Sequence, residues 1–169
     1  HGDVMGGVIA TSERLAKGLR QIRIATCALL HPMGAYMLHR GLQTLPARIR
    51  MAQSNCEQIA YFLESHPAIS KVYYPGLMNT DLIPDQIRGG GSMLAFEIKG
   101  GFEAGVKCVQ TCELLSHLAN IGDTRSLILH PASTTHRQLT EKQRIAAGAG
   151  DDVIRLSIGL ETVDDIIAD

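Results

Sequence analysis

An arginine stands in the middle of an apolar run near the C-terminal end of the chain. Residues 153–159 read V-I-R-L-S-I-G, and an apolar run of this length and composition is typical of a buried strand. A permanently charged guanidinium inside such a strand is costly unless an anion meets it. Arg155 therefore pairs with a carboxylate such as Asp151, Asp152 or Glu161, faces solvent, or binds an anionic ligand.

The apolar periodicity along the chain alternates between the spacing of helices and that of strands. We expect helices at 13–22 after the N-cap Ser12, along 32–65 with a break or kink at Pro46, at 102–118, after the capping box of Thr140 and Gln143, and after Thr162. We expect strands at 7–11, 69–74, 92–99, 127–129 and 153–158, and a loop at 78–91.

The faces of these elements indicate how they pack. In the strand at 92–99, Leu94, Phe96 and Ile98 share one face, which is typical of a half-buried antiparallel strand. The long helical stretch carries an apolar stripe that predicts a core-facing helix: Ile49, Ala52, Cys56, Ile59, Ala60 and Leu63. We therefore predict an α/β fold of the α+β kind, in which helices pack on a small, largely antiparallel sheet.

Composition excludes several functions. The net charge of -1 and the pI of about 6.7 give no electrostatic footprint for nucleic acid or an anionic membrane, and the apolar runs are too short to span a bilayer. The four cysteines show no C-x-x-C spacing, which favours free thiols in a reducing cytoplasm, and the histidines show no zinc-ligand spacing.

Several ordered motifs together resemble one enzyme family. L-H-P-A-S-T-T-H-R-Q-L at 129–139 precedes the strand that contains Arg155. The others are H-G-D-V-M-G-G at 1–7, L-x-R-G-L-Q-T-L at 38–45, F-L-E-S-H-P at 62–67, V-Y-Y-P-G-L at 72–77 and F-E-I-K-G-G at 96–101. This series resembles the pyridoxal-phosphate (PLP) enzymes of cysteine and methionine metabolism, the transsulfuration family.

The resemblance implies a domain organisation. Residues 47–169 would form the small C-terminal domain of a type I PLP-dependent transferase fold. Residues 1–46 would form the tail of the large cofactor domain and the start of the connecting helix. The chain begins with His1 rather than Met and ends inside an apolar helical pattern, so we expect it to be part of a longer polypeptide.

The resemblance also implies a substrate site. In this family the arginine of R-L-S-x-G holds the α-carboxylate of the amino-acid substrate, which assigns that role to Arg155. The turn that begins with Asn120 and Ile121 assists the carboxylate, and a turn containing Gly122 can direct main-chain N–H groups at an anion. We predict Arg155, Asn120 and Ile121 as substrate-binding residues. The hydroxyl-rich loop at 133–136 either caps backbone groups or contacts ligand.

The implied cofactor is pyridoxal 5′-phosphate, and the resemblance places its Schiff-base lysine just upstream of His1. The lysines of the chain have no matching context and are expected to be solvated: Lys17, Lys71, Lys99, Lys107 and Lys142. We therefore predict no catalytic, cofactor-binding or metal-binding residue within the chain, and we expect the segment alone to be inactive.

The motifs point to a set of related reactions. The A-N-I-G-D turn and the 129–139 string look most like O-acetylhomoserine sulfhydrylases, which replace the γ-substituent of an O-acylhomoserine by sulfide. Methionine or cystathionine γ-lyase and cystathionine γ-synthase remain alternatives, as does an inert fragment that serves as an interaction module. The family is usually tetrameric, so we expect a homo-oligomer and exposed apolar side chains around Leu29, Leu30 and Met33.

Overall fold

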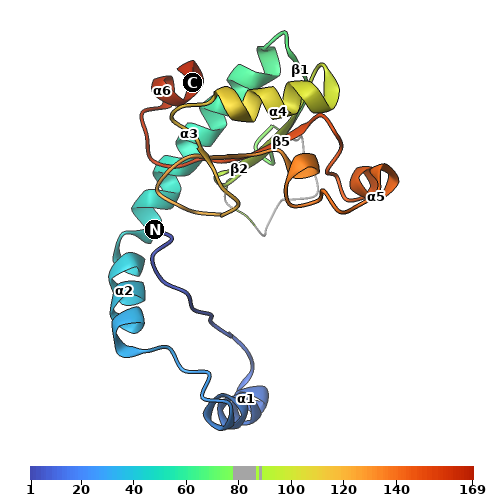
Figure 1. Cartoon of the computed structure of the whole chain (residues 1–169). Coiled ribbons are helices and arrows are strands. Elements are labelled where there is room, and N and C mark those ends of the chain that lie inside the picture. The colour runs from blue at the N-terminus through green and yellow to red at the C-terminus, as the bar shows by residue number, and fades with distance from the viewer. Residues whose placement is uncertain (78–86, 88) are drawn as a thin grey trace. The chain divides into compact units, whose positions relative to one another are not determined.

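The computed structural model describes residues 1–77, 87 and 89–169, and the loop expected at 78–91 lies largely outside them. The chain divides into two compact units, His1–Pro46 and Ala47–Asp169. Figure 1 shows the elements of both units along the chain.

The first unit contains two helices, α1 (Glu13–Ala25) and α2 (Pro32–Gln43). The predicted start of α1 after Ser12 is confirmed, and the helix continues beyond residue 22 to Ala25. Pro32 begins α2, where its missing N–H costs no hydrogen bond, and the His31 ring accepts a hydrogen bond from the Gly34 N–H at 3.1 Å.

The strand predicted at 7–11 is wrong, because these residues form no regular element. Val8 is 92% exposed and Ile9 72% exposed, and no strand of the described residues pairs with them. An apolar run becomes a strand only where a neighbouring strand takes up its backbone hydrogen bonds. The expected exposure of Leu29, Leu30 and Met33 is confirmed, at 61%, 36% and 61%.

The helical stretch predicted at 32–65 consists of two helices, which confirms the predicted break rather than the kink. α2 ends at Gln43, Thr44 forms a turn, and α3 (Leu45–Ser65) begins with Pro46 in its first turn. The predicted stripe of α3 is buried at Ala52, Cys56, Ile59 and Ala60. Leu63 is half-buried against the same core, whereas Ile49 is 43% exposed and lies before Ala52, the first residue of α3 that the core buries.

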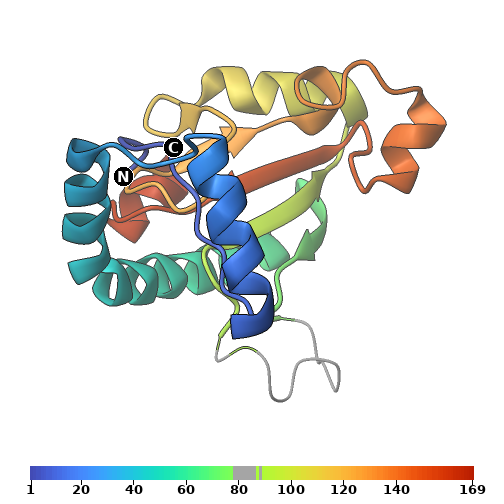
Figure 2. The ribbon, with the colours of Figure 1, turned by 90° about the horizontal axis from the view of Figure 1, so that it is seen from below.

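A five-stranded sheet organises the second unit, in the order β1-β2-β5-β4-β3. Its strands are β1 (Ile69–Tyr73), β2 (Met93–Ile98), β3 (Ser116–His117), β4 (Leu127–Leu129) and β5 (Val153–Ser157). Only the short β3–β4 pair is parallel, which confirms the largely antiparallel sheet. Figure 2 shows β2 and β5 side by side in the middle of this unit.

Three helices supply side chains to a core on one face of this sheet: α3, α4 (Gly101–Thr111) and α6 (Val163–Ala168). Their apolar residues meet the strand residues Leu94, Phe96, Ile128, Ile154 and Leu156. The predicted mixed fold with helices packed on the sheet is thus confirmed. Because side chains alternate along a strand, Arg155 and Ser157 lie on the opposite face from Ile154 and Leu156.

The helix predicted at 102–118 is wrong in its second half, because α4 ends at Thr111. The N–H groups of Glu113, Leu114 and Leu115 donate to the Asp169 carboxylate at 2.7, 2.9 and 3.1 Å. Ser116 then begins β3 beside β4. These backbone donors are engaged by the C-terminal residue and the sheet, so they are not available to continue a helix.

The short elements near the C-terminus follow the sequence signals. The 3₁₀ turn η1 (Pro131–Ser133) follows β4, and α5 (Glu141–Ala146) follows the predicted capping box. The Gln143 side chain accepts a hydrogen bond from the Thr140 N–H at 2.9 Å, which satisfies a helix donor that otherwise has no partner. The predicted capping position Thr162 precedes α6.

Candidate functional site

Arg155 lies at the centre of β5, which is itself the central strand of the sheet. Its neighbours across the ladder are Ala95 of β2 and Leu129 of β4. The side chain is half-buried, whereas Ile154 and Leu156 on either side are 0% and 5% exposed in the core. Arg155 thus presents its charge on the face away from the core, next to the small Ala95.

No carboxylate of the described residues pairs with Arg155. The ion pairs in this part of the chain join Arg125 to Asp123 and Arg144 to Asp151. Glu161, another expected partner, instead accepts hydrogen bonds from Ser126. The interpretation of Arg155 as half of an internal ion pair with Asp151, Asp152 or Glu161 therefore fails within the described residues.

The predicted turn at Asn120–Ile121 adjoins the strand that carries Arg155. Gly122 has a φ of 74°, a conformation that glycine adopts without strain, and its N–H donates to the Ser157 hydroxyl at 3.4 Å. Ser157 is two residues from Arg155 and shares its face. A hydrogen bond through Ser157 thus joins the turn to the arginine strand. The sequence analysis did not predict this role of Ser157.

The side chains of that turn differ in their exposure to solvent. Asn120 is half-buried and Ile121 is 66% exposed, and within the described residues the Asn120 side chain does not hydrogen-bond to Arg155. Asp123 is buried, and its carboxylate accepts the N–H groups of Thr124 and Arg125 at 2.7 and 3.4 Å. Burial acts to raise the pKa of Asp123, but these hydrogen bonds and the Arg125 charge lower it below its ordinary value.

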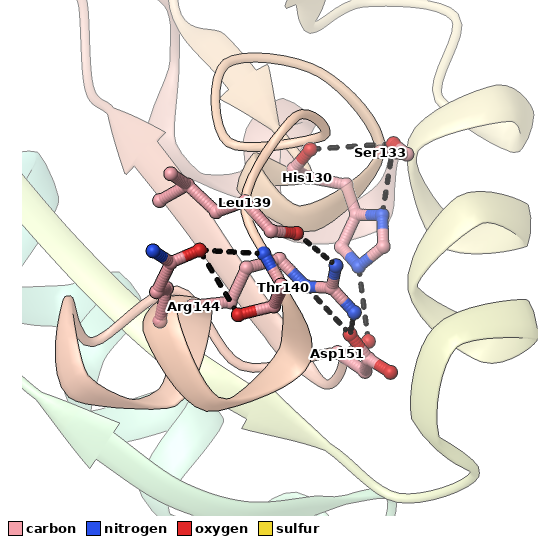
Figure 3. A network of polar contacts seen from close by, with 7 residues as sticks. His130, Ser133, Leu139, Thr140, Arg144 and Asp151 are labelled. Carbon is pink, nitrogen blue, oxygen red and sulfur yellow. Dashed lines mark hydrogen bonds and ion pairs between the residues drawn. The ribbon is translucent and has the colours of Figure 1, made fainter.

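The hydroxyl-rich loop has a structural explanation. The hydroxyl groups of Ser133 and Thr134 donate to the His130 carbonyl at 3.3 and 2.7 Å. These two residues therefore cap backbone groups, which was the first of the two predicted alternatives. The fully buried His130 ring lies 2.9 Å from the Ser133 hydroxyl through Nδ1 and 3.0 Å from the Asp151 carbonyl through Nε2. Figure 3 shows the His130 ring between Ser133 on one side and Asp151 on the other.

Arg144 completes this network. Its Nε and Nη2 donate to Asp151 Oδ1 at 3.1 and 2.7 Å, and its Nη1 donates to the Leu139 carbonyl at 2.9 Å. The guanidinium is therefore satisfied by the chain itself (Figure 3). We define the His130 network as His130, Ser133, Leu139, Arg144 and Asp151.

The lysines Lys17, Lys71, Lys99, Lys107 and Lys142 are all exposed, so none lies in an enclosed pocket where a covalent cofactor bond would be protected. Within the described residues no cluster of His, Cys, Asp or Glu could hold a metal ion. The helices of this part of the chain are also too short or too polar to cross a membrane.

Known proteins resemble the chain over its whole length. The L-methionine gamma-lyase of Brevibacterium aurantiacum is 51% identical over 172 residues, covering 100% of this chain and 41% of that protein. The L-methionine gamma-lyase of Fusobacterium nucleatum subsp. polymorphum is 43% identical over 174 residues, covering 100% of this chain and 44% of that protein. The chain thus spans about two fifths of the length of these curated relatives.

Solved structures agree with the fold. Cystathionine gamma synthase from Xanthomonas oryzae pv. oryzae superposes with a TM-score of 0.86 at 36% identity, covering 95% of this chain and 42% of that structure. A Campylobacter jejuni protein named as an O-acetylhomoserine (thiol)-lyase gives a TM-score of 0.76 at 42% identity, covering 84% and 35%. A model of the Cys/Met metabolism PLP-dependent enzymes matches residues 1–169, and the chain belongs to this family, as the motifs predicted.

Proposed function

We propose that this chain supplies the substrate-carboxylate part of the active site of a PLP-dependent enzyme of sulfur amino-acid metabolism. Arg155 would hold the α-carboxylate, and the turn at Asn120 and Ile121 would bound the same site. The observation that carries the proposal is the half-buried Arg155 guanidinium, which has no carboxylate partner in the described residues. A substrate carboxylate would supply the missing anion.

The chemistry of the guanidinium suits this role. Its planar fork donates two parallel, charge-assisted hydrogen bonds to a carboxylate, which fixes the direction of the amino acid as well as its position. When bound, pyridoxal phosphate supplies the electron sink for breaking bonds at the α-carbon. We propose that its lysine lies upstream of His1. The Campylobacter jejuni structure contains a pyridoxyl-lysine, which supports attachment of the cofactor through a lysine.

Two reactions compete for the full-length protein. The A-N-I-G-D turn and the 129–139 string favour γ-replacement on an O-acylhomoserine, as in a sulfhydrylase. The identity of 51% to a curated L-methionine gamma-lyase favours γ-elimination from methionine as a second candidate. Both substrates carry an α-carboxylate and a leaving group on the γ-carbon, so Arg155 would serve either reaction.

A direct assay separates the two candidates. The purified full-length protein is supplied with O-acetylhomoserine and sulfide in one reaction and with L-methionine alone in another. Homocysteine formation in the first identifies a sulfhydrylase, whereas methanethiol release in the second identifies a γ-lyase. Absence of both products together with absence of the cofactor absorbance band would contradict the enzyme proposal and favour an interaction module.

We further propose that residues 1–46 are the tail of the cofactor domain and that the full-length protein is a homo-oligomer, namely a tetramer. Support comes from the exposed apolar side chains of the first unit, including Met5 at 93%, Leu29 at 61% and Met33 at 61%. Exposed apolar side chains gathered in one segment favour burial against other protein surface. Sedimentation of the full-length protein as a monomer at micromolar concentration would contradict this assembly.

A further inference from the structure

The chain after Arg155 returns closely past residues 124–126, which directly follow the Asn120–Asp123 turn, and hydrogen-bonds to them. The Gly159 N–H donates to the Ser126 hydroxyl at 2.9 Å, and the Leu160 N–H donates to the Thr124 carbonyl at 2.9 Å. A Cβ on Gly159 would stand 2.4 Å from the Thr124 oxygen, so only glycine allows this approach. The segment that follows β5 and the segment that follows the turn are therefore packed backbone to backbone.

Glu161 holds this junction through Ser126. Its Oε1 accepts the Ser126 N–H at 2.7 Å, and its Oε2 accepts the Ser126 O–H at 2.8 Å. Ser126 is 0% exposed, and its hydroxyl in turn accepts the Gly159 N–H. The Glu161 carboxylate therefore accepts two charge-assisted hydrogen bonds from the buried Ser126. Because Ser126 also accepts the Gly159 N–H, Glu161 fixes the position of Gly159 through Ser126.

Asn55 of α3 supports the same junction from the helix. Its side-chain amide, in a residue only 7% exposed, donates to the carbonyls of Gly159 at 3.3 Å and Glu161 at 2.9 Å. These partners lie more than 100 positions away in the sequence, at separations of 104 and 106. Helix, strand end and turn thus meet at one polar cluster, which we name the Glu161 junction: Asn55, Ser126, Gly159 and Glu161.

The position of the Glu161 junction suggests what it does. On one side it fixes the strand that carries Arg155, four residues before Gly159. On the other it fixes Ser126, in the segment that directly follows the turn whose Gly122 donates to Ser157. We infer that Glu161 is a positioning residue, which sets the arginine strand and the Asn120–Ile121 turn at the spacing that a substrate carboxylate requires. This inference rests on the proposed function, because it presumes that Arg155 binds that carboxylate.

The test uses the full-length holoenzyme and the variants Glu161→Ala and Glu161→Gln. Glu161→Ala removes both acceptors from Ser126, so we expect the amino-acid KM to rise about tenfold while kcat falls less, because binding groups displaced by a fraction of an ångström lose much of their effect. Glu161→Gln keeps an acceptor for the Ser126 N–H and should recover part of the loss. Glu64→Ala, an exposed glutamate on α3, is the matched control and should leave KM unchanged.

A double-mutant cycle with Arg155→Ala connects Glu161 to the arginine. If Glu161 acts by positioning, the KM of Glu161→Ala/Arg155→Ala should lie within about threefold of that of Arg155→Ala, because coupled residues are not additive. Fully additive effects would overturn the inference. So would a folded Glu161→Ala enzyme with an unchanged KM, or one whose only defect is a lower unfolding temperature.

Two further measurements cover the cases in which Glu161→Ala does not fold or Arg155→Ala has no effect. Should Glu161→Ala fail to fold, Ser126→Ala and Asn55→Ala replace it, with the exposed Gln58→Ala as control, and an unchanged KM in both would overturn the inference. If Arg155→Ala itself leaves KM unchanged, the proposed function fails instead. The two failures are therefore distinguishable from each other.

Discussion

The second unit contains two half-buried arginines in contrasting surroundings. Arg144 belongs to the His130 network, where its side chain is 17% exposed and all three of its nitrogens donate to Asp151 or to the Leu139 carbonyl. Arg155 stands in the centre of the sheet without a carboxylate partner in the described structure. The fold thus satisfies the hydrogen bonds of Arg144, whereas the partner of Arg155 in our proposal is the substrate carboxylate.

The largest effect should come from Arg155→Ala in the full-length enzyme. Loss of a bidentate, partly desolvated ion pair of about 3–5 kcal/mol should raise the amino-acid KM and lower kcat/KM by about 10²–10⁴-fold. Arg155→Lys should recover little, because an ammonium cannot present the planar fork. The unfolding free energy should change by less than about 1 kcal/mol, because no internal pair is broken.

Steady-state kinetics and urea unfolding of the same variant measure both quantities. If Arg155→Ala unfolds while its activity per folded molecule is normal, Arg155 is a structural residue. The contrast with Arg144 would then disappear, and the carboxylate would have to bind elsewhere.

His130→Ala should have the largest effect on stability. The ring is 0% exposed, contacts Phe102 edge-on with a centroid distance of 5.1 Å, and bonds to Ser133 and the Asp151 carbonyl. Its removal leaves a cavity and unpaired polar groups, so we expect a loss of about 2–4 kcal/mol in unfolding free energy. Activity per folded molecule should stay near that of the parent. Urea unfolding beside the exposed His117→Ala checks the prediction, and equal stabilities would contradict it.

Arg144→Ala should destabilise less than His130→Ala. The Arg144–Asp151 pair is partly exposed, at 17% and 38% for the two side chains, so solvent screening limits its contribution to about 1–2 kcal/mol. The amino-acid KM should not change. Thermal unfolding and steady-state kinetics, with the exposed Arg137→Ala as control, test whether Arg144→Ala lowers stability without changing KM, the reverse of what we expect for Arg155→Ala. A KM that rises as in Arg155→Ala would show that both arginines serve the site.

The smallest effect concerns pH and Asp123. Its pKa is lowered in the folded chain, so the unfolded chain binds the proton more readily. The resulting stability is present above the ordinary carboxyl pKa of about 3.9 and is lost as the pH falls through the lower folded value. Asp123→Asn should therefore weaken the acid-side loss of stability. Urea unfolding of parent and variant at a series of pH values below 6 measures it, and parallel curves would refute the role of Asp123.

Local signals predicted most of the elements correctly. The Thr140–Gln143 capping box, the proline in the first turn of α2 and the alternation of Leu94 and Phe96 each act over a few residues, and each is confirmed. The strand at 7–11 and the second half of the helix at 102–118 were wrong for one reason. Their backbone groups depend on distant partners. No strand of the described residues pairs with 7–11, whereas Asp169 and β4 engage the backbone after α4.

The sequence by itself determined that a strand with a central arginine forms near the C-terminus and that the chain belongs to the Cys/Met metabolism family. Only the tertiary structure decided that the expected carboxylates Asp151 and Glu161 have partners other than Arg155. Asp151 is engaged by Arg144 and Glu161 by Ser126, and both arrangements depend on where loops and strand ends come together in space. Charge pairing is set by distances of a few ångströms between atoms, which spacing along the sequence does not fix.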